Sequence, residues 1–188
     1  MTGVQTCALP IWLPLGADLT NRVRVVVSDL PLIAESEGDN NSPQNGQAIA
    51  IPTGINGRIE SEADLDYFTF EAKQDGHYSF EVLARRCGSQ LDSHLRILDK
   101  TGKQQTFNDD LTFGEHKFSD SQIEDWSPRV DGTYTIEIRD LHLRGGDDFP
   151  YFLKITSSQP GFDLYSDNDL VPIRSEEHTS ELQSHLNL

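Results

Sequence analysis

Carboxylate and amide side chains gather in three short segments of this chain, and they are the groups that calcium sites use. Ca²⁺ binds about six to eight oxygen atoms, which flexible loops supply from Asp, Glu and Asn side chains and from backbone carbonyls. We predict a cation site where the loop at residues 37–41 meets one of the other two segments. The candidate ligands are Glu37, Asn40, Asp64, Asp66, Asp109 and Asp110. For any single group a simpler explanation exists, because Asp and Asn also favour turns.

Residues that could carry out catalysis are not grouped in any familiar pattern. The sequence contains no Gly-x-Ser-x-Gly, no His-Glu-x-x-His, no phosphate-binding glycine loop with Lys and no Cys-x-x-Cys. The histidines away from the two ends are not spaced as metal ligands: His77, His94, His116 and His142. We therefore predict a chain that is not an enzyme, with calcium as its one expected cofactor.

The composition narrows the class of partner. The 188 residues carry a formal net charge of −16, and the isoelectric point is near 4.5. An acidic surface without a cluster of Lys and Arg repels phosphate backbones, so we expect no nucleic-acid partner. No apolar run reaches the roughly 18–20 residues that a membrane helix needs. High Asp, Asn, Gly and Ser with few cysteines favours an extracellular, cell-surface or periplasmic bacterial protein.

Short strands separated by turn residues dominate the chain. Apolar alternation and β-branched runs predict strands at Ala48–Ile51, Ile55–Ile59, Asp66–Ala72, His77–Ala84, Leu95–Leu98, Gln105–Phe107, Gly132–Asp140 and Phe149–Thr156. About eight such strands, with turns at intervals of roughly 8–12 residues, predict an all-β fold, an antiparallel β-sandwich.

The strands also predict which side chains face the core. Phe68, Phe70 and Ala72 share one face of their strand, and Ile136 shares a face with its neighbours two residues away. Glu137 then points outward. The turn at 74–76 predicts a positive φ at Gly76.

The two ends resemble translated adapter sequence from a sequencing library, and we exclude them from reasoning about the fold. We interpret residues 1–11 and 174–188 in this way. Residues 12–28 are then the last strand of a truncated upstream β domain, and 29–46 are a linker and calcium loop. The sandwich occupies 47–157, and 158–173 begin a truncated downstream β domain.

Several sequence blocks, in this order, resemble the bacterial prepeptidase C-terminal domain. The blocks are Glu37 with Asn40-Asn41, Asn56-Gly57-Arg58-Ile59, the segment 64–70, Asp75-Gly76, the segment 108–110 and Asp131-Gly132-Thr133-Tyr134. The resemblance implies a jelly-roll-like β-sandwich of the kind found beside secreted proteases. Some members of this domain family bind calcium. It places Glu37 and Asn40 where the family's calcium loop usually reads Glu-Pro-Asn-Asp, and here Gly38-Asp39 replaces the proline.

We therefore expect a non-catalytic accessory or binding module of a secreted multidomain protein, associated with a peptidase. Its expected partners are neighbouring domains of the same parent chain and an extracellular polymer, protein or glycan. One alternative is a carbohydrate-binding module, for which Trp126 and Tyr151 are the aromatic candidates. Another is a fragment of a secreted protease whose catalytic domain lies outside this sequence.

Overall fold

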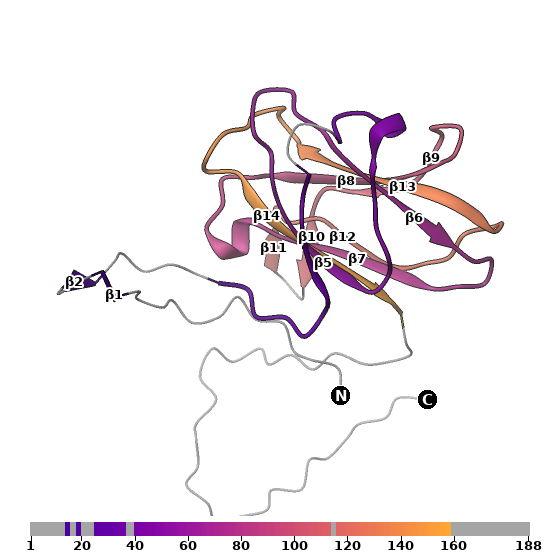
Figure 1. The fold of residues 1–188 in the computed structure, drawn as a ribbon, viewed down its shortest axis with the longest axis horizontal. Coiled ribbons are helices and arrows are strands. Elements are labelled where there is room, and N and C mark those ends of the chain that lie inside the picture. Colours follow the sequence, from indigo (N-terminus) through magenta and orange to yellow (C-terminus); the bar gives the residue numbers. More distant parts are fainter. Residues whose placement is uncertain (1–13, 16–17, 20–24, 37–39, 114–115, 159–188) are drawn as a thin grey trace, which may run out of the picture.

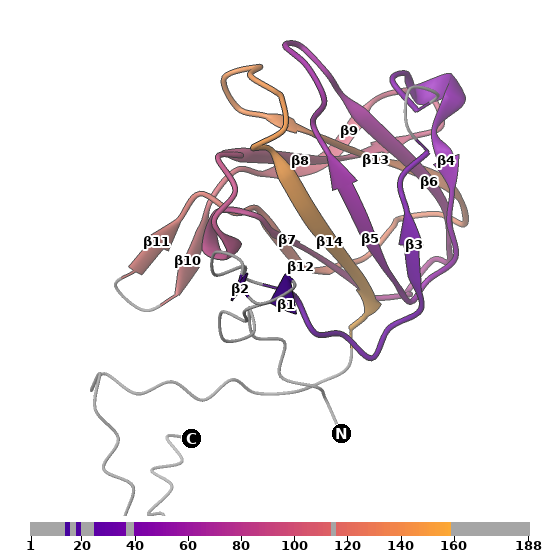
Figure 2. The same ribbon diagram turned by 60° about the vertical axis from the view of Figure 1, so that its left-hand side comes forward.

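Alternating apolar residues form two sheets that face each other. The computed structural model describes residues 14–15, 18–19, 25–36, 40–113 and 116–158. Within these residues, both sheets have five strands (Figures 1 and 2). One sheet, named here the β14 sheet, has the order β12 (Gln122–Trp126), β7 (Tyr78–Leu83), β14 (Pro150–Ser157), β5 (Thr53–Arg58), β3 (Leu32–Ala34). The other, the β13 sheet, has the order β4 (Gln47–Ala48), β6 (Asp66–Ala72), β13 (Gly132–Asp140), β8 (Ser93–Asp99), β9 (Gln104–Asn108).

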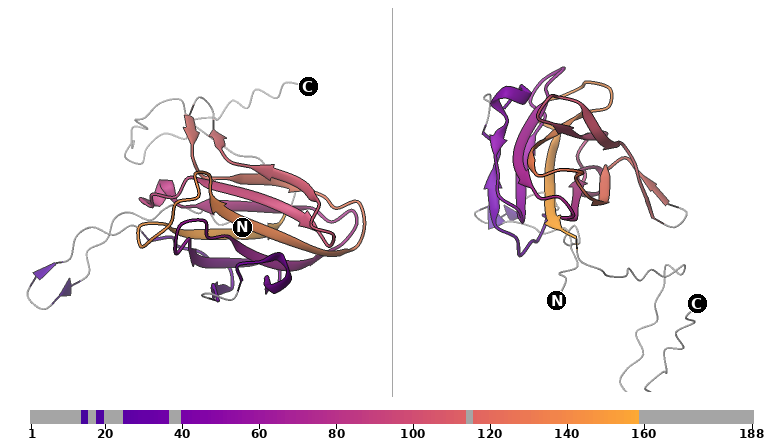
Figure 3. Two further views of the ribbon diagram at one scale, coloured as in Figure 1. Left: turned by 90° about the horizontal axis from the view of Figure 1, so that it is seen from above. Right: turned by 90° about the vertical axis from the view of Figure 1, so that its right-hand side faces the viewer.

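Two small ribbons and two 3₁₀ turns complete the described elements. The ribbons pair β1 (Pro14–Leu15) with β2 (Asp18–Leu19), and β10 (Leu111–Phe113) with β11 (His116–Phe118). The β10–β11 ribbon stands out from the sandwich, as Figure 3 shows. The turns are η1 (Pro43–Asn45) and η2 (Arg85–Cys87). Among the described residues, the structure has no helix with the length and apolar character to cross a membrane.

The predicted all-β sandwich is confirmed, with two departures in strand pairing. β3 pairs with β5 and β4 pairs with β6 in parallel, whereas the other pairings are antiparallel. Both of these edge strands, β3 and β4, come before β5 in the chain. β3 is three residues long, which is too short for alternation to predict, and it lies within the segment 29–46 expected to be a linker.

One face of each central strand lies in the shared core, as predicted. Phe68 is fully buried and Phe70 is 2% exposed in β6, while Ile136 and Ile138 are fully buried in β13. The register places Ile136 between Phe68 of β6 and Ile97 of β8. Each large apolar side chain that is buried contributes about 1.5–3 kcal/mol, so this core accounts for the stability of the sandwich.

Glu137 points away from the core, as predicted, but its neighbours cover it. The side chain is 1% exposed. Arg96 donates from Nε to Oε1 over 2.8 Å and from Nη2 to Oε2. Burial, and then the charge of Glu137, raises the pKa of Tyr67, on the opposite neighbouring strand, to about 12. The buried carboxylate of Glu137 thus finds its hydrogen-bond donors in Arg96, on the neighbouring strand β8, at the outer face of the sheet.

The turn at 74–76 differs from its prediction. The positive φ, 62°, belongs to Asp75 and not to Gly76. Gly76 is needed for space instead, because a Cβ there would lie 2.7 Å from the hydroxyl of Tyr78. That hydroxyl accepts a hydrogen bond from the Lys73 amide, 3.0 Å away, which closes the turn.

Two further predicted segments fall partly or wholly outside the described residues. Of the strand expected near residues 21–28, the structure describes 25–28, where Val26 forms a single bridge and no strand is present. The start of a downstream β domain expected at 158–173 lies beyond Ser158, the last described residue.

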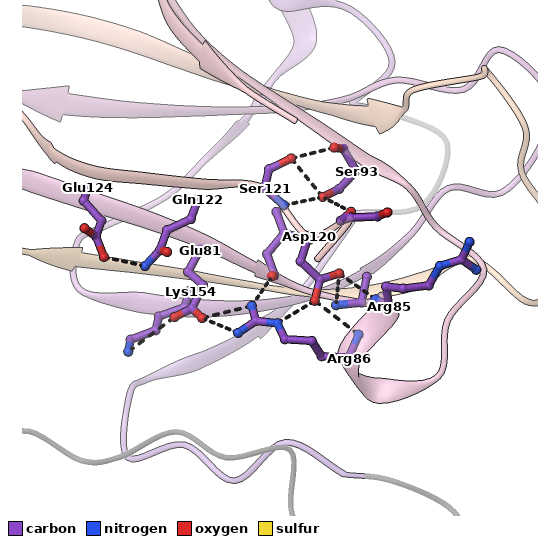
Figure 4. Close-up of polar contacts among 12 residues, drawn as sticks. Glu81, Arg85, Arg86, Ser93, Asp120, Ser121, Gln122, Glu124 and Lys154 are labelled. Carbon is purple, nitrogen blue, oxygen red and sulfur yellow. Dashed lines mark hydrogen bonds and ion pairs between the residues drawn. The ribbon is translucent and has the colours of Figure 1, made fainter. Parts of the chain in front are cut away.

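A buried carboxylate joins the loop after β7 to the chain before β12 (Figure 4). Asp120 is fully buried and accepts hydrogen bonds from the amides of Ala84, Arg85 and Arg86, at 3.2, 2.6 and 3.2 Å. It also accepts one from Arg86 Nε over 2.7 Å, and the same guanidinium bonds to Glu81. Asp120 therefore supplies acceptors for the donors of η2, which the short turn cannot pair internally.

Replacing Asp120 by Ala should lower the free energy of unfolding by about 3 kcal/mol, because it removes the acceptor of three backbone amides, the buried one of Ala84 among them, and one partner of the half-buried Arg86 guanidinium. Urea denaturation followed by tryptophan fluorescence measures this loss. The matched control is Asp131→Ala, which removes a carboxylate that also accepts from a backbone amide and a Lys, but at an exposed position. Equal losses in the two variants would contradict the role assigned to Asp120.

Candidate functional site

Two acidic side chains from different sheets meet at one end of the sandwich. Asp66 is the first residue of β6 and is 1% exposed. Its Oδ2 accepts a hydrogen bond from the hydroxyl of Tyr151 in β14, over 2.8 Å. Its carboxyl group also shares a hydrogen bond with that of Glu35, the residue after β3. The pair therefore bridges the β13 sheet and the β14 sheet.

Backbone groups hold Glu35 in place. Its amide donates to the carbonyl of Asn56 over 2.9 Å, which continues the β3–β5 ladder. Its Oε2 accepts from the amide of Arg58 over 2.8 Å, and its Oε1 accepts from Asn40 Nδ2 over 2.7 Å. Because β-strand side chains alternate, the parallel register on β5 decides that this residue faces Asp66.

Gly57 makes room for the pair. A Cβ at this position would overlap the ring and hydroxyl of Tyr151 and would lie 2.6 Å from Glu35 Oε2. The residue sits in β5, opposite Tyr151 in the sheet register. This explains the glycine in the sequence block Asn56-Gly57-Arg58, because a side chain at position 57 would push the phenol of Tyr151 away from the carboxyl group of Glu35.

Asn40 lies beside Glu35, and its side-chain oxygen Oδ1 has no hydrogen-bond partner. The residue is 1% exposed, and its carbonyl accepts from the Tyr67 amide over 3.0 Å. Its Nδ2 is used by Glu35, while its Oδ1 is buried without a donor. A buried acceptor that is left unpaired costs about 1–3 kcal/mol, so this oxygen is where a missing partner would be expected.

The electrostatics of the site disfavour a second negative charge. Burial, followed by the hydrogen bond and the charge of Glu35, raises the pKa of Asp66 to about 10. Burial and the nearby charges of Asp66 and Glu35 raise the pKa of Tyr151 well above its usual value. At neutral pH the pair of carboxyl groups thus keeps one proton between them.

The structure brings together some of the predicted ligands and separates others. Asn40 and Asp66 belong to the site, and Asp64 lies beside it, where its charge adds to the raised pKa of Asp66. Asp64 is 8% exposed, and its Oδ2 accepts from the Glu60 amide over 2.7 Å. Glu37 lies outside the described residues.

Asp109 and Asp110 do not join this site. They follow β9, and both β13 and β8 lie between β9 and the strand of Asp66. Neighbouring strands are about 4.8 Å apart, so the separation is about 14 Å. One ion cannot contact both groups.

Two members of the site were missed by the sequence reasoning, Glu35 and Tyr151. The available signal for Glu35 was its place directly after the apolar segment Leu32-Ile33-Ala34. For Tyr151 the signal was its position two residues before Leu153, which places both on the core face of one strand. Neither signal says which residue of another segment each would meet.

Within the described ranges, no three or more His, Cys, Asp and Glu side chains form a group that could hold a metal ion. The carboxyl groups that meet here are the two of Glu35 and Asp66, and the other oxygens belong to an amide and a phenol. A cation at this position would therefore depend on Asn40 Oδ1 and on further oxygens from the backbone or water, as calcium sites commonly do.

The two aromatic residues expected of a carbohydrate-binding module are engaged elsewhere. Tyr151 is 4% exposed and bound to Asp66. Trp126 packs edge-on against Tyr134, with ring centroids 5.0 Å apart, and also contacts Phe70 and Phe80. Tyr151 is therefore closed to a sugar, and the partly buried ring of Trp126 packs against the aromatic core.

Comparison with known proteins gives one similar sequence and two similar structures of note. No family model matches the chain. A curated protein of Deinococcus radiodurans, named a probable subtilase-type serine protease, is 36% identical over 89 residues. The match covers 45% of this chain and 11% of that protein, so the chain spans a small part of the relative's length.

Among solved structures, the chain is similar to the pre-peptidase C-terminal domain of a collagenase from Bacillus anthracis. The TM-score is 0.38 at 14% identity, over 63% of this chain and 100% of that one. It is also similar to PliG, a periplasmic inhibitor of g-type lysozyme from Aeromonas hydrophila, with a TM-score of 0.40 at 13% identity, over 68% and 98% of the two chains. The collagenase domain belongs to the family that the sequence blocks resemble.

The site predicts how stability depends on pH when no metal is present. Folding raises the pKa of Asp66 from 3.8 to about 10. The folded protein thus holds a proton that the unfolded chain releases above about pH 4, and the free energy of unfolding should fall as the pH rises from there. Asp66→Asn should remove this contribution, which is at most about 1.4 kcal/mol per pH unit.

Urea denaturation in EDTA at several pH values between 5 and 9 measures the difference between the two slopes. The control is Asp75→Asn, because Asn tolerates the positive φ of that turn. This variant should keep the wild-type slope. Identical slopes for wild type and Asp66→Asn would show that Asp66 is ionised in the folded protein.

Proposed function

We propose that this chain forms a non-catalytic accessory β-sandwich, braced by calcium, in a secreted multidomain bacterial protease. The observation that carries the calcium site is the buried pair Glu35–Asp66 beside the unpaired Oδ1 of Asn40. Two carboxyl groups and an amide oxygen form a hard oxygen donor set, which suits Ca²⁺ better than softer metals. A bound calcium ion would supply the positive charge that lets both acids ionise.

The three residues come from different parts of the chain, and this gives the ion a mechanical role. Glu35 follows β3, Asn40 precedes η1, and Asp66 begins β6. An ion held by all three would fasten the segment at 32–40 to the sandwich. The direction in which the preceding chain joins the sandwich would then depend on the ion. Such control would let the domain orient a neighbouring domain.

The association with a protease is supported by sequence similarity. The matched part of the Deinococcus protease is 11% of its length, which leaves most of that protein for other domains. The described residues contain two histidine–aspartate pairs, His77–Asp125 and His142–Asp92, and in neither does a Ser, Thr or Cys hydrogen-bond to the histidine ring. We propose that any peptidase chemistry belongs to the parent protein, and that this protein acts outside the cell or in the periplasm. The proposed partners are the neighbouring domains and an extracellular polymer.

Thermal melts of the full chain with calcium and with EDTA test the proposed site. Calcium at 100 times its Kd should add about 2.7 kcal/mol to the free energy of unfolding, seen as a rise of several degrees in Tm. Glu35→Gln and Asp66→Asn should lose this rise, because each removes one carboxylate ligand.

Asp110→Asn is the matched control. It also removes one carboxylate, but from the end of β9, and it should keep the full rise. Melts that are the same with calcium and EDTA for the wild type would overturn the calcium site, and so would an equal loss in all three variants.

A further inference from the structure

The residues on either side of Glu35 present backbone groups to the open edge of the β14 sheet. In the parallel ladder, Gly54 N donates to Pro31 O and Glu35 N donates to Asn56 O, both over 2.9 Å. Backbone groups alternate in direction along the strand, so residues 32, 34 and 36 face the other way. The carbonyl of Ala34 and the amide of Ser36 therefore point away from β5, where a further strand would pair.

Gln47 occupies that edge with a side chain. Its Oε1 accepts from the amide of Ser36 over 2.9 Å, and its Nε2 donates to the carbonyl of Ala34 over 3.1 Å. One primary amide thus offers the same donor and acceptor that a backbone residue of a neighbouring strand would offer. The two contacts bracket Glu35, the residue between them.

Gln47 itself belongs to the other sheet. It is the first residue of β4, and its register partner in β6 is Phe68, two residues after Asp66. The Gln47 amide therefore ties the strand that carries Glu35 to the strand neighbouring Asp66. It acts across the seam where the edges of the two sheets approach each other.

We propose that Gln47 is a positioning residue, which holds Glu35 opposite Asp66 so that the two acids can share one cation. The inference rests on the calcium site proposed above. The Gln47 side chain touches no ligand oxygen, and its effect passes through the backbone of residues 34–36. Without it, β3 would remain on β5, but the backbone on both sides of Glu35 would lose its hydrogen bonds to the second sheet, and the contact of Glu35 with Asp66 would remain.

The test is a calcium titration of the full chain by calorimetry, comparing wild type with Gln47→Met. Methionine has nearly the same length and cannot form either hydrogen bond. We expect a loss in calcium affinity of about fivefold or more, since each hydrogen bond is worth a factor of about five. Gln105→Met is the control, because this amide also bridges two groups, Asp99 and Lys103, but lies on β9.

Amide hydrogen exchange in EDTA supplies a second measurement that a general loss of stability would not imitate. The Ser36 amide should exchange faster in Gln47→Met, while the Val82 amide, which donates to Ser121 O inside the sandwich, should keep its wild-type rate. Faster exchange at both amides would mean global destabilisation and would overturn the positioning role.

The outcomes separate the two proposals. Both proposals are supported if the wild type and Gln105→Met bind calcium with the same affinity and Gln47→Met binds it more weakly. Equal affinity in wild type and Gln47→Met overturns the role and leaves the calcium site standing. No calcium binding by the wild type overturns the site, and with it the role, whatever the exchange rates show.

Discussion

The pairing of Glu35 with Asp66 is the constraint on which this end of the molecule depends. Two acids that are buried together cannot both ionise without a neighbouring positive charge, yet the backbone of β3, β5 and β6 places them within hydrogen-bond reach. The glycine at 57, the phenol of Tyr151 and the edge strand β3 are all arranged around this contact. A retained proton meets the constraint, and so would the calcium ion proposed above, for which the unpaired Oδ1 of Asn40 would be a further ligand.

Other buried acids show how this protein satisfies a carboxylate when no cation is intended. Asp120 accepts from three backbone amides and Arg86. Glu137 is held by Arg96 from the next strand. Burial opposes the charge of Asp140, but hydrogen bonds from Arg144 and from backbone amides outweigh it and lower the pKa of Asp140. Each of these three has an internal positive partner or several amide donors. Asp66 has neither, and its nearest charged neighbour is another acid. This contrast sets Asp66 apart from the other buried acids described here.

Side-chain amides close both seams between the two sheets. At one seam Gln47 of β4 bonds to the backbone beside β3, and at the other the Oδ1 of Asn108 in β9 accepts from the amide of Gln122 in β12 over 2.9 Å. An edge strand exposes unpaired donors and acceptors that invite pairing with other chains. The amides satisfy some of these groups and also couple the sheets. At the first seam that coupling reaches the acid pair, which links the protection of an edge to the geometry of the site.

The order of apolar and polar residues was enough to predict the two-sheet core and the inward faces of β6 and β13, because side-chain direction along a strand repeats every two residues and is set locally. Asn40 and Asp66 were named as candidate ligands from the segments rich in Asp and Asn, and their role as ligands stays a prediction. The partner of Asp66 could not be found in this way. Glu35 was not predicted, and it lies beside Asp66 because three residues of parallel pairing on β5 set its place. Asp109 and Asp110 looked equivalent to Asp66 along the chain, but strand order places two strands between them. Local alternation determines which way each side chain points, whereas strand order and register, which depend on the packing of the whole sandwich, decide which side chains meet.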